Sequence, residues 1–327
     1  MIISRAPFRI SFVGGGSDME EFYSKQPGAV LCTSINKYVY ISSHPYFRPD
    51  QTLLKYSSME LIDDIHHINH PIFKEVFQEF NCSGGIEINS SADVPAGTGL
   101  GSSSAFTVAL LHNFYARNRE YAQKDTLANL ACNIEINRLN SPIGKQDQFA
   151  SAFGGINRLT FQPNGMVTVT PIFLSPDVLK EIENNLLMFF TGNTRSASSI
   201  LSYQKKAVRH ADKQIILSEM VDLVDQLETC LVKEDLDQFG IILNQNWELK
   251  KQLTSSISND EINAMYETAL NNGAIGGKLL GAGGGGFLLF YCPKSQQSKL
   301  RSALSNLQEL TFNFEFEGAK VVHIENE

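Results

Sequence analysis

Ten residues near the end of the first third of the chain, Pro95–Ser104 (PAGTGLGSSS), lead directly into an apolar helix pattern over residues 102–117. The alternating glycines let the backbone turn tightly and let its amide groups approach an anion without obstruction by a Cβ atom. The first turn of the helix supplies unbonded N–H groups and the positive end of the helix dipole. The run therefore predicts a phosphate-binding turn between a strand and a helix.

The spacing within this run differs from the two commonest phosphate-binding loops. No Gly-Lys-[Ser/Thr] sequence ends it, as it would in a Walker A loop, and the glycines do not fit the dinucleotide pattern GxGxxG. A tight turn with a serine cap and no ligand is the structural alternative. We favour a ligand role because glycines and serines are so densely arranged.

Composition and charge narrow the class of protein. The chain has 327 residues, enough for two domains, with 43% hydrophobic and 19% charged residues, as in a compact enzyme. Its net charge of −8 argues against a general nucleic-acid binder, which needs a basic face. Five widely spaced cysteines indicate reduced thiols rather than disulfides or a zinc site. With no signal-peptide pattern and no stretch long enough to span a bilayer, we expect a cytoplasmic protein without a membrane partner.

Two halves of different organisation follow from the residue patterns. The first half is rich in strands, whereas the second begins with helices and ends with mixed elements, so we predict domains at residues 1–172 and 173–327. Strands are expected at residues 1–13, 29–34, 38–43, 52–56, 85–89, 157–161, 166–172, 186–191, 276–280, 287–292 and 320–324. Helices are expected at residues 18–25 (with Asp18 as N-cap), 71–80, 102–117, 125–139, 197–251, 260–271 and 296–307.

Three motifs in order resemble those of the GHMP kinases, the family of galactokinase, homoserine kinase, mevalonate kinase and phosphomevalonate kinase. Pro95–Ser104 matches the defining loop of that family, Pro-x-x-x-Gly-Leu-Gly-Ser-Ser-[Ser/Ala]. The segment 6–18 (APFRISFVGGGSD) resembles the N-terminal motif, and the segment 278–287 (KLLGAGGGGF) resembles the C-terminal one.

This resemblance implies an α+β fold of two domains, the first like ribosomal protein S5 and the second ferredoxin-like. It also implies an ATP- and Mg²⁺-dependent sugar kinase. The expected ATP-binding residues are those of the glycine-rich loop, namely Pro95, Gly97, Gly99, Leu100, Gly101, Ser102, Ser103 and Ser104.

The resemblance also assigns the catalytic and metal-binding residues. It implies that Glu135 and Ser103 bind Mg²⁺, and that Asp147, in the sequence GKQDQ, acts on the acceptor hydroxyl. Mg²⁺ favours hard oxygen ligands and keeps several waters, so one carboxylate and one hydroxyl suffice beside the phosphates. Arg9 corresponds to a basic residue that lies near the catalytic Asp in several members. The alternatives are an exposed helix acid for Glu135 and an outward-facing strand residue for Arg9.

The acceptor is suggested by three segments taken together, 5–18 (RAPFRISFVGGGSD), 144–148 (GKQDQ) and 191–197 (TGNTRSA). Together they resemble the heptose kinase branch of the family. Galactokinases carry Glu-His where this chain has Gly15 and Gly16, so galactose is disfavoured. The heptose kinases phosphorylate the anomeric oxygen of D-glycero-D-manno-heptose 7-phosphate, in the synthesis of nucleotide-activated heptose and surface polysaccharide. Arg195 and Lys145 are the candidates for the phosphate already on the sugar. For Arg195 the alternative is a cap or a salt bridge on the adjoining helix. The other expected substrate residues are Gly15, Gly16, Ser17, Asp18, Gly283 and Gly284.

Several alternatives stay open at this point. Another sugar kinase of the same superfamily, such as one acting on fucose, is the first. A non-catalytic sensor that binds sugar and ATP is the second, disfavoured because Asp147, Glu135 and Ser103 are all present. The histidines at positions 66, 67 and 70 are interpreted as solvated residues rather than a metal cluster. The oligomeric state, monomer or homodimer, is not predicted.

Overall fold

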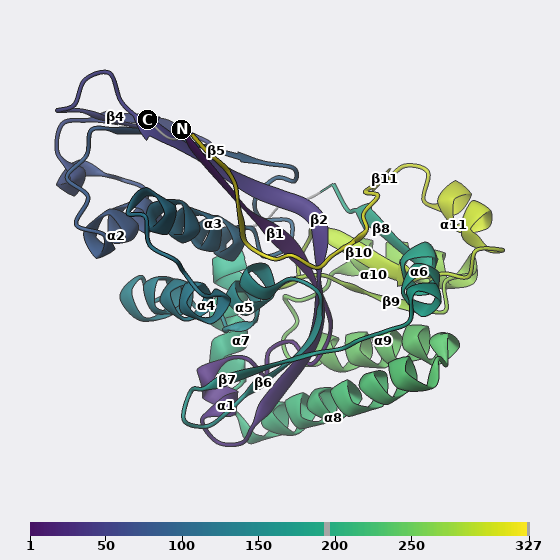
Figure 1. Cartoon of the computed structure of the whole chain (residues 1–327). Helices are drawn as coiled ribbons and strands as arrows, with labels where there is room; N and C mark the ends of the chain where they lie inside the picture. The colour runs from purple at the N-terminus through teal and green to yellow at the C-terminus, as the bar shows by residue number, and fades with distance from the viewer. Residues whose placement is uncertain (193–196, 326–327) are drawn as a thin grey trace.

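The computed structural model describes residues 1–192 and 197–325, which form two β-sheets with helices packed around them (Figure 1). The longest path through the larger sheet runs β13-β1-β2-β5-β3-β4. The 18-residue strand β2 holds this sheet together, because its first half pairs with β6 and its second half with β5. The bounds in this sheet are β1 (Ile2–Val13), β2 (Gly28–Pro45), β3 (Thr52–Lys55), β4 (Met59–Ile62), β5 (Ile86–Ala92), β6 (Ile156–Phe161), β7 (Val167–Pro171), β12 (Phe314–Glu315) and β13 (Lys320–Ile324).

The two ends of the chain meet in this sheet. Strand β13 pairs antiparallel with β1, with Ile324 opposite Ile2, and Figure 1 shows both termini at the same end of the molecule. Residues 314–315 and 320–324 thus lie in the sheet built mainly by the first half of the chain. The division at residue 172 stays a prediction, and the strand pairing adds that the last residues return across it.

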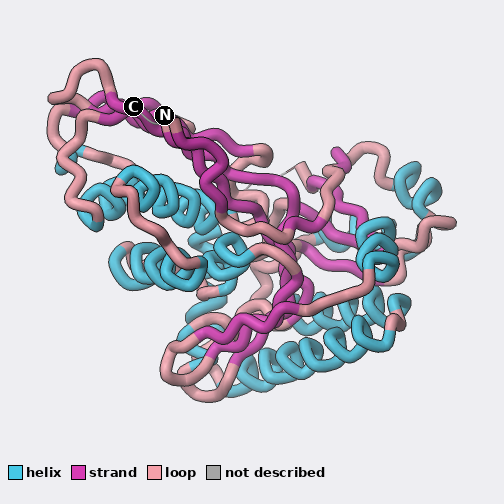
Figure 2. Tube along the Cα trace, in the orientation of Figure 1, coloured by secondary structure: helices cyan, strands magenta, loops and turns pink. Residues whose placement is uncertain are grey.

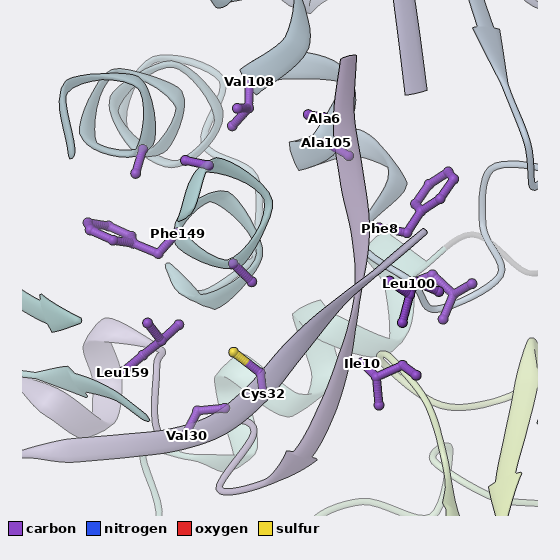
Figure 3. Packing of buried hydrophobic residues seen from close by; sticks show 14 of the residues in the cluster. Ala6, Phe8, Ile10, Val30, Cys32, Leu100, Ala105, Val108, Phe149 and Leu159 are labelled. Carbon is purple, nitrogen blue, oxygen red and sulfur yellow. The ribbon is translucent and has the colours of Figure 1, made fainter. Parts of the chain in front are cut away.

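A layer of helices lies on one side of the larger sheet, as Figure 2 shows, and includes α2 (Pro71–Glu79), α3 (Ser102–Arg117), α4 (Lys124–Cys132) and α5 (Gln146–Phe153). Helix α3 is apolar around most of its circumference because it packs against β1, β2 and α5. Figure 3 shows Phe8 and Leu100 on one side of β1 and Phe149 on the other side, all within one buried cluster. The glycine-rich loop before α3 is therefore anchored in the core.

Two helices differ in detail from what the sequence predicts. The helix expected over residues 125–139 is confirmed as a helical segment, but its second part continues from α4 as a π-helical segment, η2 (Asn133–Arg138). The short helix α1 (Glu20–Tyr23) has Met19 at its N-cap, so the expected cap by Asp18 is wrong. The Asp18 carboxylate instead accepts hydrogen bonds from the backbone N–H groups of Gly16 and Gln146, at 2.9 and 3.2 Å.

The smaller sheet lies in the second half of the chain, with strand order β11-β8-β10-β9. Numbered along the chain, this is the order fourth-first-third-second of a ferredoxin-like βαββαβ unit, which confirms the expected class for this half. Its elements are α6 (Pro176–Asn185), β8 (Leu186–Phe190), α7 (Ala197–Ala207), α8 (Ala211–Lys233), α9 (Leu236–Lys251), α10 (Asp260–Asn271), β9 (Gly276–Leu279), β10 (Phe287–Tyr291), α11 (Gln297–Ala303) and β11 (Gln308–Glu309).

Helices α8 and α9 connect the two sheets. They pack against each other, and both contact β1, while α9 also contacts β9 and β10. Trp247 of α9 is fully buried in the core between these elements. The last turn of α9 thereby comes close to the first sheet, next to the glycine-rich loops. None of the helices in residues 1–192 and 197–325 is long and apolar enough to cross a bilayer.

Candidate active site

A cavity of about 950 Å³ lies where the three glycine-containing motifs meet. Arg9 and Gly15 reach it from the first motif, Gly99 and Gly101 from the second, and Gly281 from the third. Because these segments are far apart in the sequence, only the fold brings them together. The cavity is therefore the candidate active site.

The glycine-rich loop follows the backbone path that its glycines allow. Gly97, Gly99 and Gly101 have φ angles of +77°, +85° and +79°, in the region that side chains disfavour. Gly101 is the N-cap of α3 and leaves the first N–H groups of the helix without a side-chain cap. These amide groups and the hydroxyls of Ser102 and Ser103 are at the cavity wall, which suits a phosphate group.

Arg9 and Asp147 form a bidentate ion pair beside this loop. Arg9 Nε donates to Asp147 Oδ1 and Nη2 donates to Oδ2, both at 2.7 Å, while Nη1 donates to the carbonyl of Gly99 at 2.6 Å. A Cβ atom on Gly101 would lie 3.2 Å from Asp147 Oδ2, so the carboxylate is in contact with the loop. Arg9 is 5% exposed, which excludes the outward-facing alternative. The guanidinium fixes the carboxylate with its oxygens beside the phosphate loop.

Glu135 and Ser103 meet on the other side of the loop. Ser103 Oγ donates to Glu135 Oε1 at 2.6 Å, and Gln148 Nε2 donates to Glu135 Oε2 at 2.8 Å. Glu135 is 1% exposed, so the alternative of an exposed helix acid is wrong. Burial raises the pKa of its carboxyl, opposed by the hydrogen bonds from Ser103, Gln148 and Ser104.

This hydroxyl–carboxylate pair fits a magnesium ion. Both groups are hard oxygen donors that face the cavity beside the phosphate loop. Among residues 1–192 and 197–325, no group of three or more His, Cys, Asp or Glu side chains could hold a metal. An ion at this site would therefore take its remaining ligands from water and from the phosphates of a nucleotide.

Polar groups surround Gly15 and Gly16 at the end of β1. Asp18 lines the cavity and is 8% exposed, and burial, followed by the charge of Asp147, raises the pKa of its carboxyl. Gln146 is 4% exposed, accepts a hydrogen bond from Ser11 Oγ at 3.2 Å, and has no partner for its Nε2 within the described residues. A Cβ atom on Gly15 would lie 3.2 Å from Ser11 Oγ. Because Gly15 and Gly16 have no side chains, this polar region of the cavity is open to a ligand.

Some of the expected substrate residues do not line the cavity. Lys145 donates through Nζ to the carbonyl of Gly165 at 2.6 Å and lies over the ring of Tyr23, which directs its charge away. The expected phosphate contact of Lys145 stays a prediction. The glycines at 283 and 284 pack against the backbone of Ile257 instead of reaching the cavity, whose nearest wall is formed by Gly281 and Ala282.

Two further expected residues, Ser17 and Leu100, have structural contacts of their own. The Ser17 hydroxyl donates to the carbonyls of Gly14 and Ala29, so it stabilises the turn and does not line the cavity. Leu100 is fully buried in the core beneath the glycine-rich loop and contributes its carbonyl to Arg9 N. Arg195 lies outside the residues that the structure describes.

Several cavity residues were not found from the sequence. Lys250 of α9 and Lys278 of β9 are buried lysines, and Gln146 and Gln204 are buried amides. Such residues give no signal within an ordinary helix or strand pattern. Lys278 and Gln146 lie inside the matched motifs, and this position was the signal in the sequence that could have identified them. The apolar end of the cavity was also missed and is formed by Val39, Tyr56, His70, Ile72, Val94 and Phe106.

The three histidines expected to be solvated divide into two groups. His66 and His67 are exposed, as expected, in a 3₁₀ turn at Ile65–His67. His70 is half-buried: its Nδ1 accepts from the backbone N–H of Phe73 at the start of α2, and its ring packs against Phe106. Its solvated interpretation is therefore wrong, and burial lowers the pKa of its imidazole.

Sequence comparison identifies both halves of the chain. Residues 67–155 match the family described as the GHMP kinases N terminal domain, and residues 227–309 match the GHMP kinases C terminal family. The first match contains the glycine-rich loop, Glu135 and Asp147, and the second contains Lys250 and the glycines after Leu280.

Individual relatives extend this match over the whole chain. A D-glycero-alpha-D-manno-heptose 7-phosphate kinase of Campylobacter jejuni is 29% identical, covering 98% of both chains. A bifunctional fucokinase/GDP-fucose pyrophosphorylase of Arabidopsis thaliana is 27% identical over 93% of this chain and 31% of its own length. The solved structure of a D-glycero-D-manno-heptose 1-phosphate kinase from Bacteroides thetaiotaomicron superposes with a TM-score of 0.82 over 100% of both chains, at 24% identity.

Proposed function

Because this chain belongs to the GHMP kinases, we propose that it transfers the γ-phosphoryl group of ATP to the anomeric hydroxyl of D-glycero-D-manno-heptose 7-phosphate. The family and its named sugar kinases show that the chain is an ATP-dependent phosphotransferase that acts on a sugar hydroxyl. The identity and full-length coverage of the Campylobacter jejuni heptose 7-phosphate kinase support the finer proposal. The product would be the 1,7-bisphosphate, a precursor of nucleotide-activated heptose for surface polysaccharide.

The bidentate contact between Arg9 and Asp147 carries the catalytic part of the proposal. With its carboxylate held beside Gly101, Asp147 would accept a hydrogen bond from the attacking sugar hydroxyl and take its proton as transfer proceeds. The sugar oxygen then bonds to the γ-phosphorus, the bond from the γ-phosphorus to the bridging oxygen breaks, and ADP leaves with the electron pair. Arg9 keeps the carboxylate oriented throughout.

The glycine-rich loop and its neighbours would hold the nucleotide. The N–H groups at the start of α3 suit the β- and γ-phosphates, and Ser103 with Glu135 suits Mg²⁺. When bound, Mg²⁺ would neutralise charge on the phosphates. The apolar end of the cavity, where the Tyr56 ring packs edge-on against His70, offers flat surfaces for the adenine.

The acceptor would bind where the polar groups surround Gly15 and Gly16. Asp18 is fixed by two backbone N–H groups, and Gln146 presents an unpartnered amide beside Asp147. Both side chains suit sugar hydroxyls, and the two glycines leave room for a large acceptor. Arg195 remains our proposed ligand for the 7-phosphate.

A single assay comparison tests this function. Purified protein with ATP and Mg²⁺ should release ADP with heptose 7-phosphate, and kcat/KM should be at least tenfold lower with fucose or unphosphorylated heptose. The Asp147→Asn variant should lower kcat about 10²- to 10⁴-fold, as expected for loss of a proton acceptor, without preventing nucleotide binding. Higher kcat/KM for fucose would favour the fucokinase alternative, for which the Arabidopsis relative gives some support. ATP binding without ADP release on any sugar would identify a sensor.

A further inference from the structure

Lys250 is a buried cation in the active-site cavity that the proposed mechanism does not use. It is 6% exposed, lines the cavity, and donates through Nζ to the carbonyl of Gly281. No carboxylate lies within ion-pair distance of its ammonium group among residues 1–192 and 197–325. A buried charge with only a neutral partner destabilises a fold, so its presence calls for a ligand.

The carboxylates nearest to Lys250 in the described residues do not form an ion pair with its ammonium group. Lys278 of β9 is also buried in the cavity wall, where its Nζ donates to the carbonyl of Phe12 at 2.7 Å. Asp147 is already paired with Arg9 through both oxygens, and the two oxygens of Asp18 accept from backbone N–H groups. Neither carboxylate therefore balances the charge of Lys250 by contact.

The position of Lys250 identifies the group that would balance it. Its carbonyl partner, Gly281, is in backbone contact with the glycine-rich loop, since a Cβ atom on Gly281 would lie 2.3 Å from Gly99 Cα. The same Gly99 carbonyl accepts from Arg9 Nη1. Lys250 therefore lies at the end of the loop where the proposed mechanism puts the phosphoryl group in transfer.

We infer that Lys250 binds a phosphate oxygen of the nucleotide's terminal phosphoryl group and stabilises its charge during transfer. This inference rests on the proposed nucleotide site. The phosphate already carried by the acceptor has the same chemistry, but the contact between Gly281 and Gly99 favours the nucleotide. A cation here would act on the phosphoryl group in transfer from the opposite half of the chain to Arg9 and Asp147.

Ligand binding by variants tests the inference without catalysis. We expect Lys250→Met to weaken binding of a non-hydrolysable ATP analogue at least tenfold and of ADP much less, as measured by calorimetry. Lys251→Met is the control, because Lys251 is one position along the same helix, pairs with Glu248 and does not line the cavity. Weaker binding of heptose 7-phosphate alone, with unchanged nucleotide binding, would transfer the contact to the acceptor phosphate and overturn the assignment to the nucleotide.

Stability separates this role from a structural one. If Lys250 only anchors Gly281, Lys250→Met should lower the Tm of the ligand-free protein and leave the ratio of ATP-analogue to ADP affinity unchanged, which would overturn the inference. If the charge of Lys250 is instead paired only when a ligand binds, the Tm of ligand-free Lys250→Met should equal or exceed that of the wild type, because the substitution removes a buried charge. These nucleotide measurements need no sugar, so they remain valid if heptose 7-phosphate proves not to be the acceptor.

The dependence on pH gives an independent readout. Burial and the charge of Arg9 lower the pKa of Lys250 to about 8, while Asp18 and Asp147 act in the opposite direction. Burial, followed by the charge of Lys250, lowers the pKa of the neighbouring Lys278 well below its usual value. Since an amine loses its charge above its pKa, affinity for the ATP analogue in the wild type should fall as the pH rises through about 8. Lys250→Arg stays charged and should remove this fall. An unchanged alkaline fall in both Lys250→Arg and Lys250→Met would overturn the inference.

Discussion

Gln146 shows how one side chain is oriented by its neighbours and still left open to a ligand. Ser11 Oγ donates to its Oε1 at 3.2 Å, and its backbone N–H donates to Asp18 at 3.2 Å. Its Nε2 has no partner within the described residues although the side chain is 4% exposed. A buried donor without an acceptor lowers stability, and a sugar oxygen in the cavity would relieve that cost.

We predict that Gln146→Leu raises KM for the sugar about tenfold, the size expected for one lost hydrogen bond in a buried site. KM for ATP should stay the same, because Gln146 lies on the acceptor side of Asp147. The Tm of the ligand-free protein should not fall, since the unpartnered amide is removed. Ser11→Ala should shift the same sugar KM in the same direction by less. Steady-state kinetics with each substrate varied separately would check this, and a change confined to the KM for ATP would contradict it.

From the sequence, only those site residues could be predicted that belong to a recognisable motif. Arg9, Glu135 and Asp147 were identified through their motif positions, and the structure brings all three to one cavity. Lys250 gave no signal, because a lysine in the last turn of a helix is usually a solvated residue that favours the helix dipole. Its burial depends on β1 and β9, which are distant in the sequence. Lys145, by contrast, lies inside a motif but binds the β6–β7 turn.

At the level of elements, the start of one helix and a π-helical segment together form the candidate metal site. The first turn of α3 carries Ser103, and the π-helical segment η2 carries Glu135. A π-helical turn is wider than an α-helical one and is common at functional sites. Here the segment lets the Glu135 carboxylate face the start of α3, while its carbonyl accepts from the N–H of Ser141 at 2.9 Å. Such a local change of helix type has no signal in the residue pattern.

We predict that Ser103→Ala and Glu135→Gln each increase the Mg²⁺ concentration needed for half-maximal activity, with Glu135→Gln also lowering kcat. The double variant should be little worse than Glu135→Gln alone, because groups that serve one ion are not additive. Thr107→Val is the control: Thr107 lies one turn further along α3 and its hydroxyl donates to the carbonyl of Ser103. Mg²⁺ titrations of ADP release would check this. Additive losses would argue that the two residues act separately.

The raised pKa of Glu135 predicts how this site responds to acid. Burial raises the pKa of the carboxyl, so it takes up a proton at a higher pH than an exposed glutamate does. Metal binding needs the ionised form, so the Mg²⁺ requirement should increase as the pH falls through that raised pKa. Saturating Mg²⁺ should move the acid limb of activity to lower pH. An acid limb that does not respond to Mg²⁺ would assign it to another group.

Strand β2 shows where the prediction of elements from sequence reached its limit. Two strands were expected, at residues 29–34 and 38–43, because the polar residues between them resemble a turn. In the structure these residues belong to one continuous strand, and the register with β1 shifts between Pro7 and Phe8. A bulge and a turn use similar residues, and only pairing with a neighbouring strand distinguishes them. Helix α3, by contrast, was predicted with its observed bounds from its apolar pattern.

For the molecule as a whole, long-range pairing decides what the sequence leaves undetermined. The last strand of the chain, β13, joins the first sheet beside β1, a pairing between residues more than 300 positions apart. The order of the second sheet likewise follows from contacts between distant segments. The motifs predicted a two-domain family fold, but the pattern of a single sequence does not show which strands become neighbours.

The glycine-rich segments of the second and third motifs are in direct backbone contact. Gly99 and Gly281 are in backbone contact, and a Cβ atom on Gly286 would lie 2.4 Å from the carbonyl oxygen of Thr98. Neither side of this contact has room for a side chain. The arrangement sets the distance between the proposed phosphate loop and the half of the chain that carries Lys250.

We predict that Gly281→Ala lowers kcat about a hundredfold, because a shift near 1 Å between catalytic groups costs about that much. The added Cβ atom would lie 2.3 Å from Gly99 Cα, so the two loops must separate. Gly165→Ala is the matched control: Gly165 has a similar φ, +84° against +74°, but its nearest neighbour is Lys145 Nζ at an ordinary 3.4 Å. Both variants should lose about 1–2 kcal/mol of stability from the left-handed backbone, with a further loss from crowding in Gly281→Ala alone. Equal kcat values for the two variants, measured where both remain folded, would show that the contact between the loops does not set the catalytic geometry.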